Sequence, residues 1–175
     1  MKKKVMRSLL NQRHWLNDET VLDVGCGRGL VAIEAARRVP FGRVHGVDIW
    51  HAADLSGNNP DAIRANAAIA GVSDRLTVDT GDARNLPYTD ASFDVVSSMT
   101  AIHNIGNVEG RRKAISEVWR VPRPGGQVLI FDIRHAKAYL QQLRELGAVD
   151  TALAGPVLLW GPLGWRISAT KPSSV

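Results

Sequence analysis

The sequence predicts an α/β domain in which a doubly wound, mostly parallel sheet carries helices on both faces. Short apolar runs of strand length alternate with longer segments of helical pattern. The last two strand-like runs follow each other with no helix between them. At 175 residues the chain has the length of one ordinary domain. We expect a single domain over residues 1–175, with an N-terminal helical segment at 1–19 and the core at 20–171.

Five apolar runs are predicted to form the parallel strands. Each is short and lies between turn residues, which is typical of strands covered by helices on both faces. They span residues 21–24, 44–48, 76–79, 93–97 and 127–132. Ligands of doubly wound sheets bind outside the carboxyl ends of the strands, so functional side chains are expected directly after each run.

The segments between these runs carry helix signals. Asn59 followed by Pro60 combines a cap with a first-turn proline, and proline or glycine ends several of the other segments. The predicted helices span residues 5–16, 30–39, 60–71, 108–120 and 139–146. Beyond them, residues 149–159 and 165–170 are strand-like and are joined by a turn rich in glycine and proline. An antiparallel hairpin at one edge of the sheet is therefore expected.

Composition excludes several classes of protein. Cys26 is the only cysteine, so no internal disulfide is possible. No apolar run approaches the ~20 residues of a membrane-spanning helix. The basic start at residues 1–4 is not followed by the apolar stretch of an export signal, so a cytoplasmic location is expected. No cluster of histidine, cysteine and carboxylate has metal-ligand spacing, and no metal site is expected.

The formal net charge of +5 comes from 22 basic and 17 acidic residues. Such a balance assists binding to nucleic acid, acidic lipid or an anionic metabolite. The basic residues are scattered, however, and no long basic tract is present. Charge therefore leaves nucleic-acid binding open as the less favoured alternative.

A glycine-rich turn follows the first predicted strand and precedes a helix. Glycines stand at 25, 27 and 29, where the backbone can adopt positive φ and approach a ligand closely. A dinucleotide site requires glycine at the first, third and sixth positions of the loop, and here the sixth is Leu30. A phosphate loop requires Gly-Lys-Ser/Thr at its end, which is absent. The spacing thus argues against both kinds of phosphate-binding site, and a tight strand-to-helix turn is the structural alternative to ligand binding.

Asp48 ends the second predicted strand, about twenty residues after this turn. A carboxylate at that place can accept both hydroxyl protons of a ribose. The structural alternative is a helix cap or a solvated strand end. Together with the glycine turn, the position favours ribose binding.

These motifs resemble the class I S-adenosylmethionine-dependent methyltransferases, most closely the group of the ubiquinone/menaquinone C-methyltransferases (methyltransferase type 11). The resemblance covers about residues 20–171 and rests on five pieces in order. They are the glycine turn at 21–29, Asp48, the segment 81–88, the strand at 93–96 and the Arg-Pro-Gly-Gly turn at 123–126. It implies a seven-stranded sheet of order 3-2-1-4-5-7-6 with strand 7 antiparallel, S-adenosylmethionine as methyl donor and S-adenosylhomocysteine as product.

The resemblance also implies roles for individual residues. Those expected at the cofactor are Asp23, Gly25, Cys26, Gly27, Gly29, Asp48, Ile49, Asp82, Ala83, Ser98 and Met99. The glycines would pack against the cofactor, and Asp23 would hold its ammonium group through water. Asp48 would bind the ribose. Ile49, Asp82 and Ala83 would contact the adenine, and Ser98 and Met99 would line the methionine end. Cys26 lies inside the loop and is expected to be a small packing residue.

Two departures from the family pattern are visible. Pro122 replaces the usual leucine before the Arg-Pro-Gly-Gly turn and is expected to end the preceding helix early. The connection at residues 50–58 is longer than usual, and either a loop folded over the ligands or a plain surface insertion accounts for it. Within it, Trp50 is a candidate for stacking near the adenosine.

Methyl transfer from a sulfonium is an in-line displacement, which requires alignment but no nucleophile on the protein. His103, beyond the fourth strand, is the first candidate for a base or acceptor-orienting residue, and bonding to a loop carbonyl is the structural alternative. His135, after the fifth strand, is the second candidate, beside Arg134 as an anchor for an acidic acceptor. A small-molecule methyl acceptor is the leading expectation. An RNA methyltransferase and a non-catalytic cofactor-binding module are the alternatives.

Overall fold

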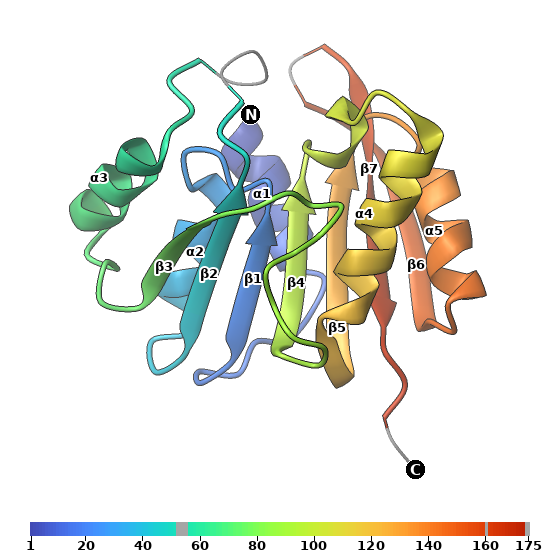
Figure 1. The fold of residues 1–175 in the computed structure, drawn as a ribbon, viewed down its shortest axis with the longest axis horizontal. Coiled ribbons are helices and arrows are strands. Elements are labelled where there is room, and N and C mark those ends of the chain that lie inside the picture. The colour runs from blue at the N-terminus through green and yellow to red at the C-terminus, as the bar shows by residue number, and fades with distance from the viewer. Residues whose placement is uncertain (52–55, 160, 174–175) are drawn as a thin grey trace.

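Seven strands form one sheet in the computed structural model, which describes residues 1–51, 56–159 and 161–173 (Figure 1). The order is β3-β2-β1-β4-β5-β7-β6. The bounds are β1 Thr20–Val24, β2 Arg43–Asp48, β3 Leu76–Thr80, β4 Phe93–Met99, β5 Pro122–Asp132, β6 Val149–Leu158 and β7 Leu163–Thr170. Strands β1 to β5 pair in parallel, whereas β7 is antiparallel to both β5 and β6. The predicted fold class, strand order and edge hairpin are confirmed.

The helices cover both faces of the sheet (Figure 1). Their bounds are α1 Lys2–Leu10, α2 Leu30–Arg38, α3 Pro60–Ala70, α4 Val108–Arg120 and α5 Ala136–Glu145, with a short 3₁₀ helix η1 at Ile102–Asn104. Buried side chains of α1, α2 and α3 form one core cluster, and those of α4 and α5 form a second cluster. Because side chains alternate along a strand, Val21 belongs to the first cluster and Leu22 to the second.

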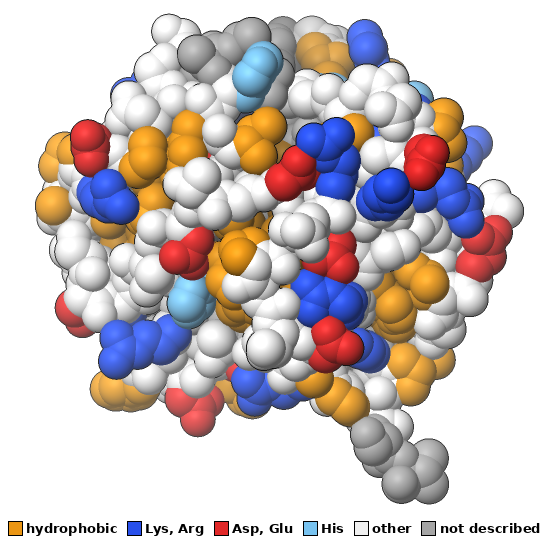
Figure 2. All heavy atoms as spheres, in the orientation of Figure 1, with side chains coloured by type: hydrophobic (Ala, Val, Ile, Leu, Met, Phe, Trp, Pro, Cys, Tyr) orange, Lys and Arg blue, Asp and Glu red, His pale blue; other side chains and the backbone are white. Residues whose placement is uncertain are grey.

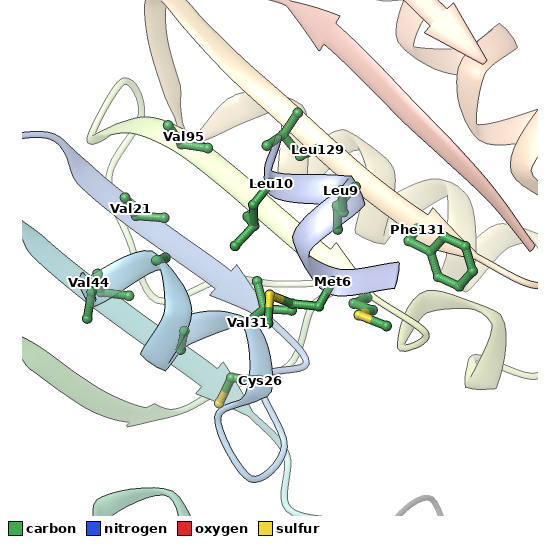
Figure 3. Packing of buried hydrophobic residues seen from close by; sticks show 14 of the residues in the cluster. Met6, Leu9, Leu10, Val21, Cys26, Val31, Val44, Val95, Leu129 and Phe131 are labelled. Atoms are coloured by element: carbon green, nitrogen blue, oxygen red, sulfur yellow. The ribbon is translucent and has the colours of Figure 1, made fainter. Parts of the chain in front are cut away.

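Helix α1 packs its buried side chains into the first core cluster. Figure 3 shows Leu9 and Leu10 of this helix above β4 and β5, with Met6 beside Val31 of α2. All three α1 side chains are at most 3% exposed. The helix therefore belongs to the packed domain.

The prediction of a leading helix over residues 5–16 is wrong at both ends, since α1 spans Lys2–Leu10. After Asn11 the chain turns back toward β1. Two contacts hold this turn: the indole N–H of Trp15 donates to the carbonyl of Leu10 at 2.7 Å, and Nη2 of Arg13 lies 2.5 Å from Oε1 of Glu19. Apolar spacing alone did not reveal these tertiary contacts.

Two further expectations need adjustment near β5. Helix α4 runs to Arg120, as far as predicted, so Pro122 does not shorten it. Instead Pro122 is the first residue of β5 and lies opposite Phe93 of β4. The fifth strand thus starts five residues before the predicted position, because the Arg-Pro-Gly-Gly turn is itself part of the extended segment.

Basic and acidic side chains are interspersed on the face shown in Figure 2. Several of the basic groups there have carboxylate partners. Nζ of Lys113 lies 3.2 Å from Glu109, and Nε of Arg120 lies 2.7 Å from Glu117. This face therefore does not form a continuous basic surface. None of the helices in the described ranges is long and apolar enough to span a membrane.

Gly25 and Gly71 allow a matched test of close packing at the glycine turn. Both have positive φ, +71° and +69°, so alanine is strained at either position. A Cβ at Gly25 would lie 2.2 Å from Cβ of Ala101, whereas a Cβ at Gly71 would meet nothing within 4 Å.

We therefore expect Gly25→Ala to lower the free energy of unfolding by about 1–3 kcal/mol more than Gly71→Ala. Urea unfolding of both variants measures the difference. Equal losses would show that Ala101 does not restrict this turn.

Candidate functional site

A cleft of about 1060 Å³ opens where β1 to β5 end. Most of the residues predicted for the site line it, although they come from four separate segments of the chain, at or after the ends of β1 to β4. They are Asp23, Gly25, Cys26, Gly27, Gly29, Asp48, Ile49, Asp82, Ala83, Met99 and His103. Pockets for organic ligands commonly measure about 300–1,000 Å³, so this cleft has room for two small molecules together.

The glycine turn is tied to the end of β2. Backbone N–H groups of Gly25 and Cys26 donate to the carbonyl of Val47 at 2.8 and 3.2 Å. The N–H of Gly27 donates to Oδ2 of Asp48 at 2.9 Å. Gly27 has φ +51°, a conformation that side-chain-bearing residues rarely adopt. The turn and the acid predicted as partners are thus joined directly.

Asp48 receives two further hydrogen bonds. Oδ1 accepts from the backbone N–H of Trp50 at 2.8 Å and from Nδ2 of Asn58 at 3.2 Å. Trp50 is not among the residues that line the cleft, which gives no support to its predicted place near the adenosine. The backbone turns at Trp50, which has φ +62°. The indole N–H of Trp50 donates to Oγ1 of Thr80 at 2.8 Å.

Asp23 is a buried carboxylate at the floor of the cleft, only 1% exposed. Oδ1 accepts from the hydroxyl of Ser97 at 3.0 Å and Oδ2 from the N–H of Ala32 at 3.1 Å. Burial, with a smaller contribution from the charge of Asp48, raises the pKa of Asp23 to about 7, and the two hydrogen bonds oppose this. No basic side chain in the described ranges pairs with it, so a ligand cation in the cleft would relieve the cost of its charge.

Asp82 is held by a neighbouring arginine. Oδ1 accepts from the backbone N–H and Nε of Arg84 at 2.8 and 2.9 Å, and Nη2 lies 2.5 Å from Oδ2. Hydrogen bonds from Arg84 lower the pKa of Asp82. Both residues line the cleft, so a ligand amino group would share this carboxylate with Arg84.

The expectation for Ser98 is wrong. Its side chain is 1% exposed and does not line the cleft, whereas Met99 does. Neighbouring strand residues point to opposite faces, and Ser98 shares the α4 face with Val96. Ser97, one residue earlier, is the serine that reaches the site, through its bond to Asp23.

His103 lies in η1 and is positioned by a fully buried carboxylate. Nδ1 of His103 lies 2.5 Å from Oδ1 of Asp132, and its backbone N–H donates to Oδ2 at 3.2 Å. The N–H of Ile133 also donates to Oδ1, at 2.8 Å. The partner of His103 is thus a carboxylate and not a loop carbonyl. Because Nδ1 faces Asp132, Nε2 is the ring nitrogen left to act on a ligand.

His135 does not belong to this site. It is exposed, precedes α5 with φ +62° and is not among the residues that line the cleft. Its ring instead lies 6.2 Å from that of Tyr139. Arg134 is also exposed and lies outside the cleft. The candidate roles of both residues beside the ligand are therefore not supported.

Cys26 behaves as a packing residue. It is 5% exposed, and a Cβ at Gly46 would lie 3.0 Å from its sulfur. Burial raises the pKa of the thiol, which disfavours the reactive thiolate. Within the described ranges, no group of three or more His, Cys, Asp or Glu residues could hold a metal ion.

Two site residues were not predicted. Asp132 ends β5 as Asp48 ends β2, and that shared position was an available signal. Asn58 lies in the long connection after β2, lines the cleft and bonds to Asp48. Its side-chain direction depends on how that connection folds, which the sequence does not show. Residues 52–55 of the connection lie outside the described residues.

A family model described as a methyltransferase domain matches residues 21–126, more than half of the chain. The chain is 32% identical over 127 residues to a demethylmenaquinone methyltransferase of Symbiobacterium thermophilum, a match that covers 72% of the chain and 47% of that relative. It is 33% identical over 135 residues to a 27-O-demethylrifamycin SV methyltransferase of Amycolatopsis mediterranei, covering 74% and 46%.

The chain thus spans about half the length of these curated relatives. A crystal structure of a SAM-dependent methyltransferase from Aquifex aeolicus superposes with a TM-score of 0.71 at 17% identity, covering 94% of this chain and 88% of that one. That likeness concerns the fold alone. Together with the matched domain and the two relatives, it establishes that the chain belongs to the class I S-adenosylmethionine-dependent methyltransferases.

Proposed function

We propose that this protein transfers a methyl group from S-adenosylmethionine to a small-molecule acceptor by in-line displacement. The observation that carries the proposal is the direct bond between Gly27 of the glycine turn and Asp48 at the cleft. Both relatives described above are named for small-molecule acceptors, a menaquinone precursor and a rifamycin. The paired charges on α4 give no support to an RNA acceptor.

The residues present fit this cofactor. Asp23 is a buried carboxylate without a cationic partner in the described ranges, and it would hold the ammonium group. Asp48 would bind the ribose, Ile49 and Ala83 would cover the adenine, and Asp82 would accept from its amino group. Gly25, Gly27 and Gly29 leave the backbone of the turn open to close approach. When bound, the cofactor supplies an electrophilic methyl group on its sulfonium.

The chain's own contribution to the reaction is alignment and proton removal. Holding donor and acceptor at near-attack distance is worth about 7–11 kcal/mol in favourable cases. His103 would take the proton of an acceptor hydroxyl, amine or enol at Nε2, while Asp132, whose Oδ1 lies 2.5 Å from Nδ1, would stabilise the imidazolium that forms.

Asp48→Ala tests the placement of the cofactor. Loss of the carboxylate that accepts from the ribose and from the N–H of Gly27 should weaken binding of S-adenosylhomocysteine by about 100-fold. Titration calorimetry measures this. Asp61→Ala, an exposed acid in the first turn of α3, is the matched control and should bind as the wild type does. If Asp48→Ala binds as tightly as the control, or the wild type binds nothing, the proposed function fails.

The raised pKa of Asp23 predicts a pH-dependent affinity. A proton competes with the ligand ammonium for this carboxylate, so binding is strong above the pKa of about 7 and is lost as the pH falls through it. Between about pH 8 and pH 6 we expect the affinity for S-adenosylhomocysteine to fall about tenfold. Asp23→Asn should bind weakly across this range without that slope. A slope that persists in Asp23→Asn would assign the titration to another group.

His103→Gln and Asp132→Asn test proton removal. An acceptor is first identified by release of S-adenosylhomocysteine over a library of hydroxylated and amino metabolites. We expect His103→Gln to lower kcat by about 10²–10⁴-fold with unchanged cofactor affinity. Asp132→Asn should lower kcat and should change the pH dependence of kcat on both its acid and its alkaline side. His135→Gln, outside the cleft, is the control; a loss equal to that of His103→Gln would contradict the assignment.

A further inference from the structure

The hydrogen-bond capacity of Asp48 is nearly exhausted by the protein itself. An ionised carboxylate offers about four acceptor sites, two on each oxygen. Oδ1 already accepts from Trp50 and Asn58, and Oδ2 from Gly27. One site on Oδ2 is left. A ribose brings two vicinal hydroxyl donors, so this carboxylate in its present contacts cannot accept both.

Asn58 provides a second acceptor at the same place. Its side chain is 8% exposed and lines the cleft, and its Nδ2 is committed to Asp48. Its Oδ1 is buried and has no hydrogen-bond partner in the part of the chain that the structure describes. An unpaired buried acceptor is costly, and a donor arriving with a ligand removes that cost.

The position of Asn58 is fixed by its neighbours along the chain. Gly57 has φ +68°, and Asn59 is the cap of α3, its Oδ1 accepting from the N–H of Ala62 at 2.9 Å. Asn58 therefore stands between a turn and a capped helix start, and its amide is oriented by the bond to Asp48. This is the preorganisation that a recognition residue requires.

We propose that Asp48 and Asn58 divide the ribose diol between them. Oδ2 of Asp48 accepts one hydroxyl, and Oδ1 of Asn58 accepts the other. The inference rests on the proposed placement of the cofactor ribose at Asp48, and it makes Asn58 a specificity-determining residue for the ribonucleoside. Each of the two hydroxyls then interacts with a different side chain.

A ligand-by-variant cycle tests this division. The probes are S-adenosylhomocysteine and its 2′-deoxy and 3′-deoxy analogues, titrated into the wild type and Asn58→Ala. We expect Asn58→Ala to weaken binding of the parent compound about tenfold, the loss of one hydrogen bond. For one of the two deoxy analogues, wild type and variant should bind equally, because the hydroxyl that Asn58 accepts is missing.

Two results would overturn the proposal: an Asn58→Ala variant that binds the parent as the wild type does, or one that weakens all three compounds by the same factor. The second result would mean that Asn58 acts only through Asp48. Asn58→Leu, close to asparagine in shape, repeats the cycle if the alanine variant has a lowered Tm. Asn59→Ala is the matched control; it removes the cap of α3 but should leave the ratios among the three affinities unchanged.

This result is separable from the proposed function. Suppose that Asp48→Ala loses binding and that Asn58→Ala weakens all three compounds by the same factor. The proposed cofactor site would then stand, and only the role of Asn58 would be refuted. Retained binding in Asp48→Ala would remove both.

Discussion

The hydrogen bond from the N–H of Gly27 to Oδ2 of Asp48 is the contact on which the cleft depends. It joins a turn that follows β1 to the residue that ends β2, and the carbonyl of Val47 holds the same turn through Gly25 and Cys26. Parallel neighbouring strands end at the same edge of a sheet, so these groups meet without a long connection. Positive φ at the glycines allows the turn to direct its N–H groups toward that edge.

Packing keeps the turn in this shape. The space for a Cβ at Gly25 is taken by Ala101, from the loop after β4, and at Gly29 by Ile63 of α3. The turn thus packs between Ala101, which lines the cleft, and helix α3. Because protein interiors are close-packed, a displacement of either segment would also move the glycine turn.

Two buried carboxylates in this part of the fold have different surroundings. Asp132 is fully buried but has His103 and two backbone N–H groups as partners, so its charge serves to orient an imidazole. Asp23 is as deeply buried and has only neutral donors, which is why its pKa is raised to about 7. A buried charge without a counter-ion is costly, and the cost is relieved either by protonation or by a cation that binds beside it. Asp23 is thus a carboxylate at the cleft without a counter-ion among the described residues, whereas the charge of Asp132 faces the imidazole of His103.

Local sequence determined the fold class, the order of the elements and the places after the strands where the site would form, because alternation, glycine spacing and caps act over a few residues. The tertiary structure decided which side chains reach the cleft: Ser97 and not Ser98 contacts Asp23, Trp50 turns away to Thr80, and His103 finds Asp132 while His135 stays outside. The contact of Asn58 with Asp48 is likewise visible only in the tertiary structure. These outcomes depend on strand phase, backbone turns and contacts between residues distant in the chain, none of which a local pattern of residue types contains.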